Sequence, residues 1–279
     1  MDCDSVVNVI KVPQFVAYWG GYFKAPTRTL DKIPSYINVV YLAFVGCDKN
    51  SGAPIDFLCS IYDEDVIKSW VKELKSRGQK VMVSLLDRPE CHWDVINLKK
   101  YAKNVKILVD EWDLDGVDID VESGMSSDHY VKSFVGLIKE LKNVLNNGYD
   151  DKLISYTCYE GTQGFDGQIL PQVKEDIDWL NTMAYFDNFD GMIELFNDYS
   201  TIIDSSKINI GVKAGHDGED QSTPLAEVIK LCKWQPNEAQ GIENIKGGMM
   251  LWTTNRDGPD FTKMKEWTYC DTINHNLLL

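Results

Sequence analysis

Three carboxylic acids recur at every second position in the stretch DGVDIDVE, residues 115–122. They are Asp118, Asp120 and Glu122, and the positions between them are aliphatic. Side chains two residues apart share one face of a β-strand, so we expect the three acids to project side by side. Like charges held together raise the pKa of at least one of them. The spacing therefore indicates carboxyl groups that hold and release protons, which is the chemistry of general acid–base catalysis.

A structural role for these acids is disfavoured, because buried carboxylates are costly without partners and the strand contains no basic residue. A metal site is the main alternative. An EF-hand counted from Asp113 fails, because Val117 occupies its fifth position and Gly124 its twelfth. A magnesium site would normally bring phosphate-binding loops or further acids on neighbouring strands. We therefore expect no metal and no cofactor.

The elements that carry these acids follow an alternating rhythm of short apolar runs and amphipathic segments, which is typical of α/β proteins. The runs predict strands at 15–19, 37–45, 80–86, 115–122, 153–159, 179–186, 208–215 and 247–254. Helices are predicted at 63–78, 94–112, 127–145, 191–204, 224–232 and 260–268. In the fifth of these, Thr223 is the expected N-cap and Pro224 the first helical residue. The connection after residue 159 is less regular.

Eight strands with helices between most of them predict one (β/α)8 barrel that spans residues 1–279, with its active site where the strands end. The alternative is an open doubly wound sheet. Against that alternative, no glycine-rich phosphate loop follows the first strand.

The net charge and the composition of the chain narrow the classes of partner that it could bind. A net charge of -15 and a pI near 4.7 disfavour binding to nucleic acid or to an anionic membrane surface. No apolar run approaches the ~20 residues of a membrane span, and the first residues do not resemble a signal peptide. The seven cysteines form no C-x-x-C pair, so we expect mostly free thiols, with a disulfide or two left open. The histidines are interpreted as surface or loop residues without a partner: His92, His129, His216 and His275.

DGVDIDVE resembles the D-G-x-D-x-D-x-E signature of glycoside hydrolase family 18, which comprises chitinases and endo-β-N-acetylglucosaminidases. The runs FVAYWG, MAYFD and GGMMLWTTNRD resemble that family's first, sixth and eighth strands, so the resemblance extends from about residue 13 to 257. One departure is Ser84-Leu85-Leu86-Asp87, where the third strand usually ends S-x-G-G. The 31 residues between Gly215 and Gly247 leave no room for an α+β insertion domain, which implies an open groove and internal cleavage.

The resemblance implies a substrate-assisted mechanism. In it Glu122 is the general acid, Asp120 holds the acetamido N–H of the sugar, and Asp118 shares a proton with Asp120. Tyr185 would bind the acetamido oxygen. Trp252 would form the floor beneath that sugar.

Three further residues are candidates for lining the same pocket. They are Tyr18, Met183 and Asp187, although Asp187 could instead be a solvated loop acid.

The expected partner is chitin or another oligosaccharide that contains N-acetylglucosamine, and we expect the protein to act as a monomer. The first hypothesis is an endochitinase. The alternatives are an endo-β-N-acetylglucosaminidase acting on the chitobiose core of N-glycans and a non-catalytic lectin, which in this family usually lacks the acid at the Glu122 position. The substrate favours an extracellular location.

Overall fold

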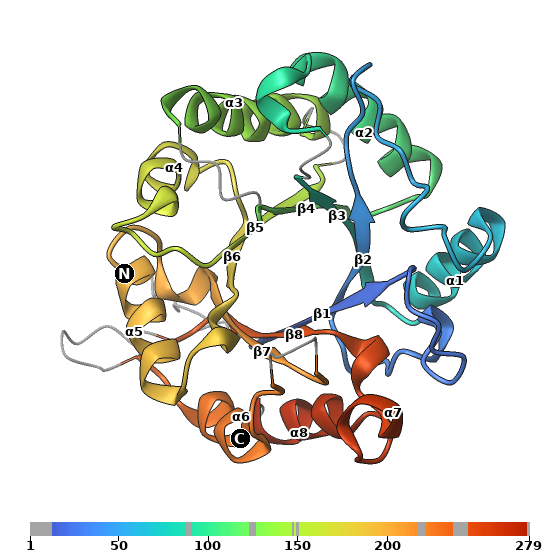
Figure 1. Ribbon diagram of the computed structural model, residues 1–279, viewed down its shortest axis with the longest axis vertical. Coiled ribbons are helices and arrows are strands. Elements are labelled where there is room, and N and C mark those ends of the chain that lie inside the picture. The colour runs from blue at the N-terminus through green and yellow to red at the C-terminus, as the bar shows by residue number, and fades with distance from the viewer. Residues whose placement is uncertain are drawn as a thin grey trace, which may run out of the picture.

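The computed structural model describes residues 13–87, 91–122, 127–146, 148, 151–216, 221–236 and 245–277. Eight parallel strands close into a barrel in sequence order, β8 pairing with β1 (Figure 1). The strands are β1 Gln14–Gly20, β2 Val39–Val45, β3 Lys80–Leu86, β4 Gly116–Asp120, β5 Leu153–Cys158, β6 Trp179–Thr182, β7 Ile208–Lys213 and β8 Gly248–Trp252. The predicted (β/α)8 fold class is therefore confirmed.

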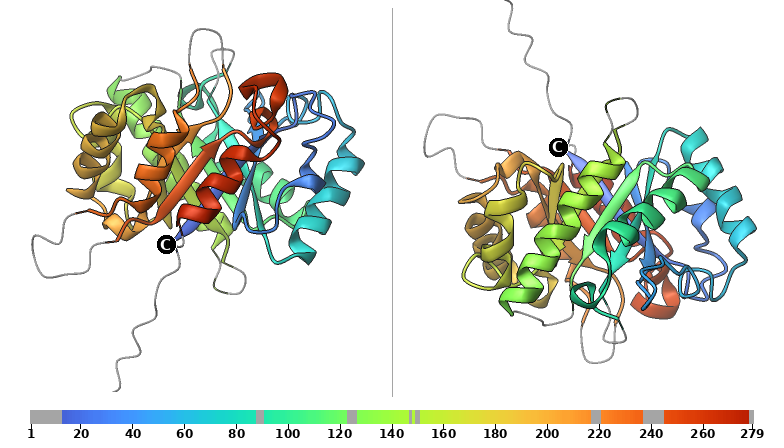
Figure 2. Two further views of the ribbon diagram at one scale, coloured as in Figure 1. Left: turned by 90° about the horizontal axis from the view of Figure 1, so that it is seen from below. Right: turned by 90° about the horizontal axis from the view of Figure 1, so that it is seen from above.

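Helices form an outer ring around the strands (Figure 1). They are α1 Glu64–Ser76, α2 Leu98–Glu111, α3 Asp128–Leu145, α4 Phe165–Val173, α5 Phe189–Ser200, α6 Leu225–Lys233, α7 Pro259–Thr262 and α8 Thr268–Leu277. The views from the side show α2 beside α3 and α6 beside α8 (Figure 2). Helix α4 occupies the connection in which the sequence shows no clear periodicity.

The two faces of β4 enter different environments. Val117 and Ile119 are fully buried in the apolar layer between strands and helices. Asp118 and Asp120 alternate with them and face the barrel interior, where a separate cluster contains Tyr18, Tyr41, Met82, Trp179 and Met250. The period of two in DGVDIDVE is thus what directs the acids inward.

The prediction that a strand spans 179–186 is wrong in its second half. Strand β6 ends at Thr182, and residues Ala184–Phe186 form a single 3-10 turn. The run is apolar throughout, so its hydrophobicity does not mark the change from strand to turn. The turn places Tyr185 just beyond the C-terminal end of β6, beside Phe186, which is 62% exposed.

The predicted last helix, 260–268, is also wrong. The chain forms one turn, α7, which Lys263 ends in the left-handed region at φ 60°, and then a new helix, α8. The Asp257 carboxylate accepts hydrogen bonds from the amides of Tyr269 and Cys270 at the start of α8. Because Asp257 stands 12 residues before Tyr269, this cap leaves no signal at the positions next to the helix start.

Two predicted helix starts are displaced. Helix α2 begins at residue 98 rather than 94, because the Asn97 side chain caps it by accepting from the Lys100 amide. Helix α6 begins after Pro224, which is its N-cap and not its first residue. The Thr223 hydroxyl, predicted to cap α6, instead accepts a hydrogen bond from the Lys213 amide.

Candidate active site

The first acid, Asp118, is fully buried and held by four hydroxyl groups. Its Oδ2 accepts from the Tyr18 hydroxyl at 2.7 Å and from Ser84 at 2.8 Å. Its Oδ1 accepts from Ser155 at 2.7 Å and from Thr157 at 3.0 Å. Burial raises the pKa of Asp118, and these four hydrogen bonds oppose the rise. Asp118 is thus a carboxylate whose oxygens are already saturated with donors.

Neighbouring polar side chains in the barrel interior extend this arrangement. The Trp179 indole N–H and the Asn181 amide both donate to the Tyr41 hydroxyl, at 2.8 and 3.0 Å. Since that oxygen already accepts two hydrogen bonds, its own proton is available for Ser155, 2.8 Å away. Ser155 then donates to Asp118. A chain of donors therefore ends on the acid and supports its negative charge.

Sequence reasoning missed this cradle of hydroxyl groups, although a signal for it exists. Ser84 and Ser155 pair in register with Asp118 on the two neighbouring strands, and Ser155 and Thr157 stand two apart on β5, as side chains that share a face do. Hydroxyl residues at matching inward positions of adjacent apolar strands would have predicted donors around the first acid.

The second acid, Asp120, is 2% exposed, and among the described residues its Oδ1 has no hydrogen-bond partner. Burial, then the charges of Glu122 and Asp118, raise its pKa well above the usual range. No hydrogen bond links it to Asp118 in the described part of the chain, so their sharing of a proton stays a prediction. A buried carboxyl oxygen that lacks a donor is ready for one from a ligand.

The third acid, Glu122, lies two residues beyond the end of β4 and is exposed to solvent. Its charge contributes to raising the pKa of Asp120, Tyr185 and Tyr159. Glu122 therefore lies close to the buried acid while remaining open to the medium. A general acid must be placed so, because it has to reach the substrate.

Tyr185 lies on the turn after β6 and packs against both the outer layer and the inner cluster. Burial, then the Asp120 and Glu122 charges, raise its pKa well above the usual value, so the phenol keeps its proton and can donate. Met183 is 3% exposed and belongs to the inner cluster. Asp187 is exposed, accepts a hydrogen bond from the Asn188 amide at 2.7 Å, and lines a cavity together with Tyr185. The predicted contacts of Met183 and Asp187 with substrate stay predictions.

Trp252 ends β8 and is partly exposed. Its ring stacks on Phe44 at 5.6 Å and 22°, and meets Tyr18 edge-on at 5.2 Å. Phe44 was not predicted, although it is the last residue but one of an apolar strand, β2, and Trp252 is the last residue of β8. Tyr18 itself is 1% exposed and bonds to Asp118, so it supports the acid. Its predicted contact with substrate stays a prediction.

The ends of β1 and β8 are tied together behind these rings. The Thr253 and Thr254 hydroxyls donate to the Tyr18 carbonyl at 2.7 and 3.0 Å. The Gly20 amide donates to the Asn255 side chain at 2.7 Å. These bonds fix Trp252 against Tyr18, because they join the residues on either side of the ring contact.

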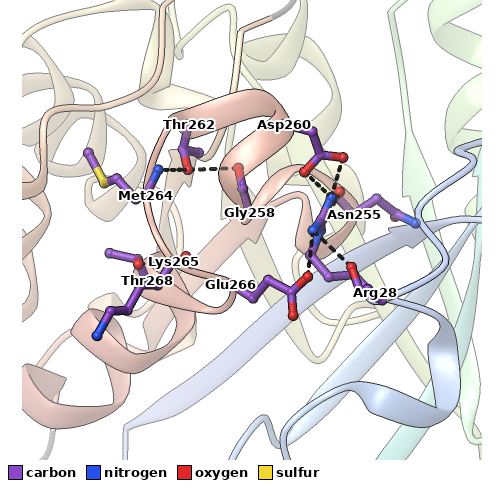
Figure 3. Close-up of polar contacts among 10 residues, drawn as sticks. Arg28, Asn255, Gly258, Asp260, Thr262, Met264, Lys265, Glu266 and Thr268 are labelled. Atoms are coloured by element: carbon purple, nitrogen blue, oxygen red, sulfur yellow. Dashed lines mark hydrogen bonds and ion pairs between the residues drawn. The ribbon is translucent and has the colours of Figure 1, made fainter.

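Arg28 secures the same loop from outside the barrel (Figure 3). The side chain is 2% exposed, and its Nε donates to the Asn255 carbonyl at 2.9 Å. Its Nη2 contacts both oxygens of Asp260, at 2.6 and 2.7 Å, and Nη1 reaches Glu266 at 3.3 Å. The guanidinium thereby connects the segment after β1 to the segment after β8.

Replacing Arg28 by Met is expected to lower the free energy of unfolding by about 1–3 kcal/mol, the range for leaving a buried acceptor unpaired. The acceptor is the Asn255 carbonyl. Asp260→Asn is the matched control and should cost at most about 1 kcal/mol, since its side chain is 52% exposed. Urea denaturation measures both. Equal losses in the two variants would show that the ion pair, rather than the buried hydrogen bond, stabilises this loop.

The departure from S-x-G-G has two consequences. Leu86 packs against the inner cluster and pairs in register with Asp120, so its side chain fills space beside the acids. Asp87 faces the helices and accepts hydrogen bonds from the Tyr130 hydroxyl and the Trp93 amide, and His92 Nδ1 lies 3.0 Å from it. The prediction that His92 has no partner is therefore wrong. Asp87 is buried, and its hydrogen bond with Tyr130 links the segment after β3 to α3.

The raised pKa of Asp120 has a consequence for stability. The unfolded side chain loses its proton near pH 3.9, whereas the folded one retains it to higher pH. In that window the folded state binds more protons, so unfolding becomes easier as the pH rises. Asp120→Asn removes this penalty. The variant should melt above the wild type at pH 7, by about 2–4 °C per kcal/mol, and the difference should shrink towards pH 4.

Calorimetric melting curves of both proteins between pH 4 and 7 measure this effect. An Asp120→Asn protein that melts below the wild type at pH 7 would contradict a carboxyl group destabilised by its surroundings.

Among the described residues, no group of histidine, cysteine and acidic side chains could hold a metal ion. The six cysteines within this part of the chain are free thiols, while Cys3 lies outside it. No described helix is long and apolar enough to cross a membrane.

Comparison with known proteins places this chain in a family. The family model for the TIM-barrel domain of the endo-β-N-acetylglucosaminidase EndoS matches residues 20–251. A chitinase structure from Bacteroides thetaiotaomicron is similar at TM-score 0.75 and 12% identity, covering 96% of this chain and 97% of that one. An endo-β-N-acetylglucosaminidase variant from Cordyceps militaris, in complex with fucosyl-N-acetylglucosamine-Asn, is similar at TM-score 0.73 and 19% identity, covering 95% and 91%.

A curated relative, chitinase ChiA of Flavobacterium johnsoniae, is 24% identical over a match of 152 residues, and the match covers 45% of this chain and 10% of that protein. These identities are low, and the solved structures support the fold alone. The family model, however, extends over most of the barrel, and its matched range includes Asp118, Asp120 and Glu122. The chain therefore belongs to the EndoS TIM-barrel family of glycoside hydrolase family 18.

Proposed function

We propose that this protein is a retaining, endo-acting hydrolase of β-1,4 linkages between N-acetylglucosamine units, in which the substrate's acetamide is the nucleophile. The observation that carries the proposal is Asp120: a buried carboxyl group with an unpartnered oxygen, a raised pKa, and an exposed acid two residues away. Nearby, Asp118 is saturated with donors. Asp120 is therefore available to accept a hydrogen bond from a ligand N–H, and Glu122 is available to exchange protons.

In the first step the acetamido oxygen attacks the anomeric carbon as the glycosidic C–O bond breaks. Glu122 transfers its proton to the departing oxygen. The product is an oxazolinium ion. Asp120 passes the proton that it shares with Asp118 to that acid and, as a carboxylate, offsets the positive charge of the ion. The Tyr185 phenol, which keeps its proton, holds the acetamido oxygen in attacking geometry, and the partly exposed ring of Trp252 lies beneath the sugar.

In the second step a water molecule attacks the anomeric carbon and the oxazolinium ring opens. Glu122, now a carboxylate, accepts the proton of that water. Two successive inversions at one carbon retain the configuration. The cycle needs no metal or cofactor, and each proton that leaves Glu122 returns to it.

Chitin oligosaccharides are the first candidate substrate. The names of the curated relative and of several similar structures are those of chitinases. An open groove follows from the short connection between β7 and β8, within which the described helix is α6. Such a groove suits cleavage within a chain rather than threading from its end.

The chitobiose core of N-glycans is the second candidate, and the family model favours it because its description names an endo-β-N-acetylglucosaminidase. The same linkage is cleaved in both cases, so the three acids serve either substrate. The sugars on the non-reducing side differ: N-acetylglucosamine in chitin, mannose in the glycan.

One experiment separates these functions. The purified protein is incubated with chitin oligosaccharides and, in parallel, with a high-mannose glycoprotein, and products are identified by mass. Short N-acetylglucosamine oligomers support the first candidate, and released glycans that retain one N-acetylglucosamine support the second. Binding to either ligand without turnover would overturn the proposal in favour of a lectin.

A further inference from the structure

A cavity of about 400 Å³ lies at the amino end of the barrel. Its lining includes Gln14, Leu153 and Trp179, the first residues of β1, β5 and β6, and Gly247, which directly precedes β8. Glu122 lies beyond the carboxyl end of β4, so the cavity is on the opposite side of the barrel from the candidate active site. In the proposed mechanism the substrate contacts none of these lining residues.

The lining of this cavity combines hydrogen-bonding groups with apolar surface. Its polar side chains are those of Gln14, Asn38, Asp178 and Ser206. Amides and hydroxyls both donate and accept, and a carboxylate accepts, while Leu153 and the ring of Trp179 are apolar. The described lining includes one acid and no basic side chain, which favours a neutral ligand over an anion. A ring with hydroxyl groups at its edge and C–H groups on its face matches both kinds of surface.

A buried acceptor without a donor lies beside the cavity. Asn209, on β7, is fully buried, and among the described residues its Oδ1 has no hydrogen-bond partner. A Cβ atom placed on Gly247, in the cavity lining, would lie 2.9 Å from this oxygen. Buried polar groups nearly always have a partner, and a ligand hydroxyl placed against Gly247 would supply one.

A first hydrogen-bond route leads from the cavity to the candidate active site. The Trp179 indole N–H donates to the Tyr41 hydroxyl at 2.8 Å. That hydroxyl lies 2.8 Å from Ser155, which donates to Asp118 at 2.7 Å. Burial, then the charge of Asp118, raises the pKa of Tyr41, so the phenol keeps the proton that it donates to Ser155. The indole that lines the cavity is therefore three hydrogen bonds from the catalytic strand.

A second route reaches the same tyrosine. The Asn209 amide lies 3.5 Å from Gln14 Oε1 in the lining and donates to Asn181 Oδ1 at 3.0 Å. The Asn181 amide in turn donates to the Tyr41 hydroxyl at 3.0 Å. Both routes therefore meet at Tyr41, and a ligand in the cavity can contact a residue of each.

We infer that this cavity is an effector site for a neutral, hydroxylated ring, and that its occupant lowers the rate of hydrolysis through the hydrogen bonds that meet at Tyr41. A ring that packs on Trp179 and donates to Asn209 fixes one residue of each route. Asp118 then keeps its donors as a carboxylate, which opposes transfer of the shared proton from Asp120. The effect on rate rests on the proposed function, whereas binding does not.

Binding is tested with the monosaccharides N-acetylglucosamine and glucose, and with glucose 6-phosphate as an anionic ring of the same shape. The reporter is the ¹H–¹⁵N signal of the Trp179 indole, assigned by its loss in Trp179→Phe. Both neutral sugars should shift this signal to saturation, and the phosphate should not. Ser206→Tyr, which fills the cavity, should weaken binding at least about tenfold, or about 1.4 kcal/mol.

The matched control for this variant is Ser76→Tyr, at an exposed position that ends α1, and it should bind as the parent does. An indole signal that neither sugar shifts, or a shift that Ser206→Tyr leaves unaltered, would overturn the site. This measurement needs no turnover, so a protein that cleaves neither candidate substrate would refute the proposed hydrolase while the indole signal still decides the site.

Initial rates on chitin oligosaccharides test the effect on catalysis. Saturating N-acetylglucosamine should lower kcat by at least about fivefold, the low end of coupling between two sites, and leave KM nearly unchanged. Ser206→Tyr should remove this inhibition, and Ser76→Tyr should retain it. A rise in KM at constant kcat would mean that the sugar competes at the catalytic acids, and would overturn the effector role.

Discussion

Replacing Glu122 by Gln is expected to lower kcat/KM on chitin oligosaccharides by about 10²–10⁴-fold, the usual contribution of a general acid. Gln has the same size and fills the same space, but it cannot transfer a proton to the departing oxygen. The side chain is exposed, so the substitution should not affect folding. Initial rates measure the loss of turnover, and calorimetry measures binding. We expect the rate to fall while the affinity for the oligosaccharide is retained.

Two comparisons sharpen the test of Glu122. Glu175→Gln, at an exposed position, makes the same chemical change elsewhere and should leave the rate unaltered. A substrate with an aryl leaving group needs less protonation, so the loss in its kcat/KM should be smaller than that for a natural oligosaccharide. A Glu122→Gln protein as active as the wild type would refute the assignment.

Asp120→Asn is expected to reduce kcat by about 10²–10³-fold, the loss seen when one group that stabilises a charged intermediate is removed. Asn can still accept a hydrogen bond from the acetamido N–H, so KM should change little. It carries no negative charge, however, to offset the oxazolinium ion. The same variant is predicted to be more stable at neutral pH, because a buried, raised-pKa carboxyl group has been replaced by a neutral one.

The combination of lost rate and gained stability distinguishes Asp120 from a structural residue. A substitution that merely disturbed the barrel would lower both the melting temperature and the rate. A variant that retained its kcat would contradict the role of Asp120 in charge stabilisation, whatever its stability.

Much of the architecture follows from local patterns. Apolar runs alternate with amphipathic segments, so the order of strands, and hence the closed barrel, is predictable. The period of two in β4 likewise predicts that Asp118 and Asp120 share the inner face. Both inferences depend on interactions within a few residues, and the structure confirms the fold.

The remaining features depend on contacts between distant segments. Asp257 caps α8 from another loop, and Arg28 holds a loop more than 200 residues away, at Asn255. The hydroxyl cradle of Asp118 gathers residues from three other strands. Tyr185 lies on a turn whose apolar sequence resembles that of a strand. Each of these features depends on the tertiary arrangement of the chain, so a short stretch of sequence does not predict it.

The central claim is that the substrate's own acetamide attacks the anomeric carbon. Aryl chitobiosides that carry mono-, di- and trifluoroacetamido groups on the reacting sugar test it directly, because fluorine weakens the carbonyl as a nucleophile while changing its size little. We predict that kcat/KM falls steeply with each added fluorine. A rate that does not respond to fluorination would mean that a group of the protein, or water, attacks instead.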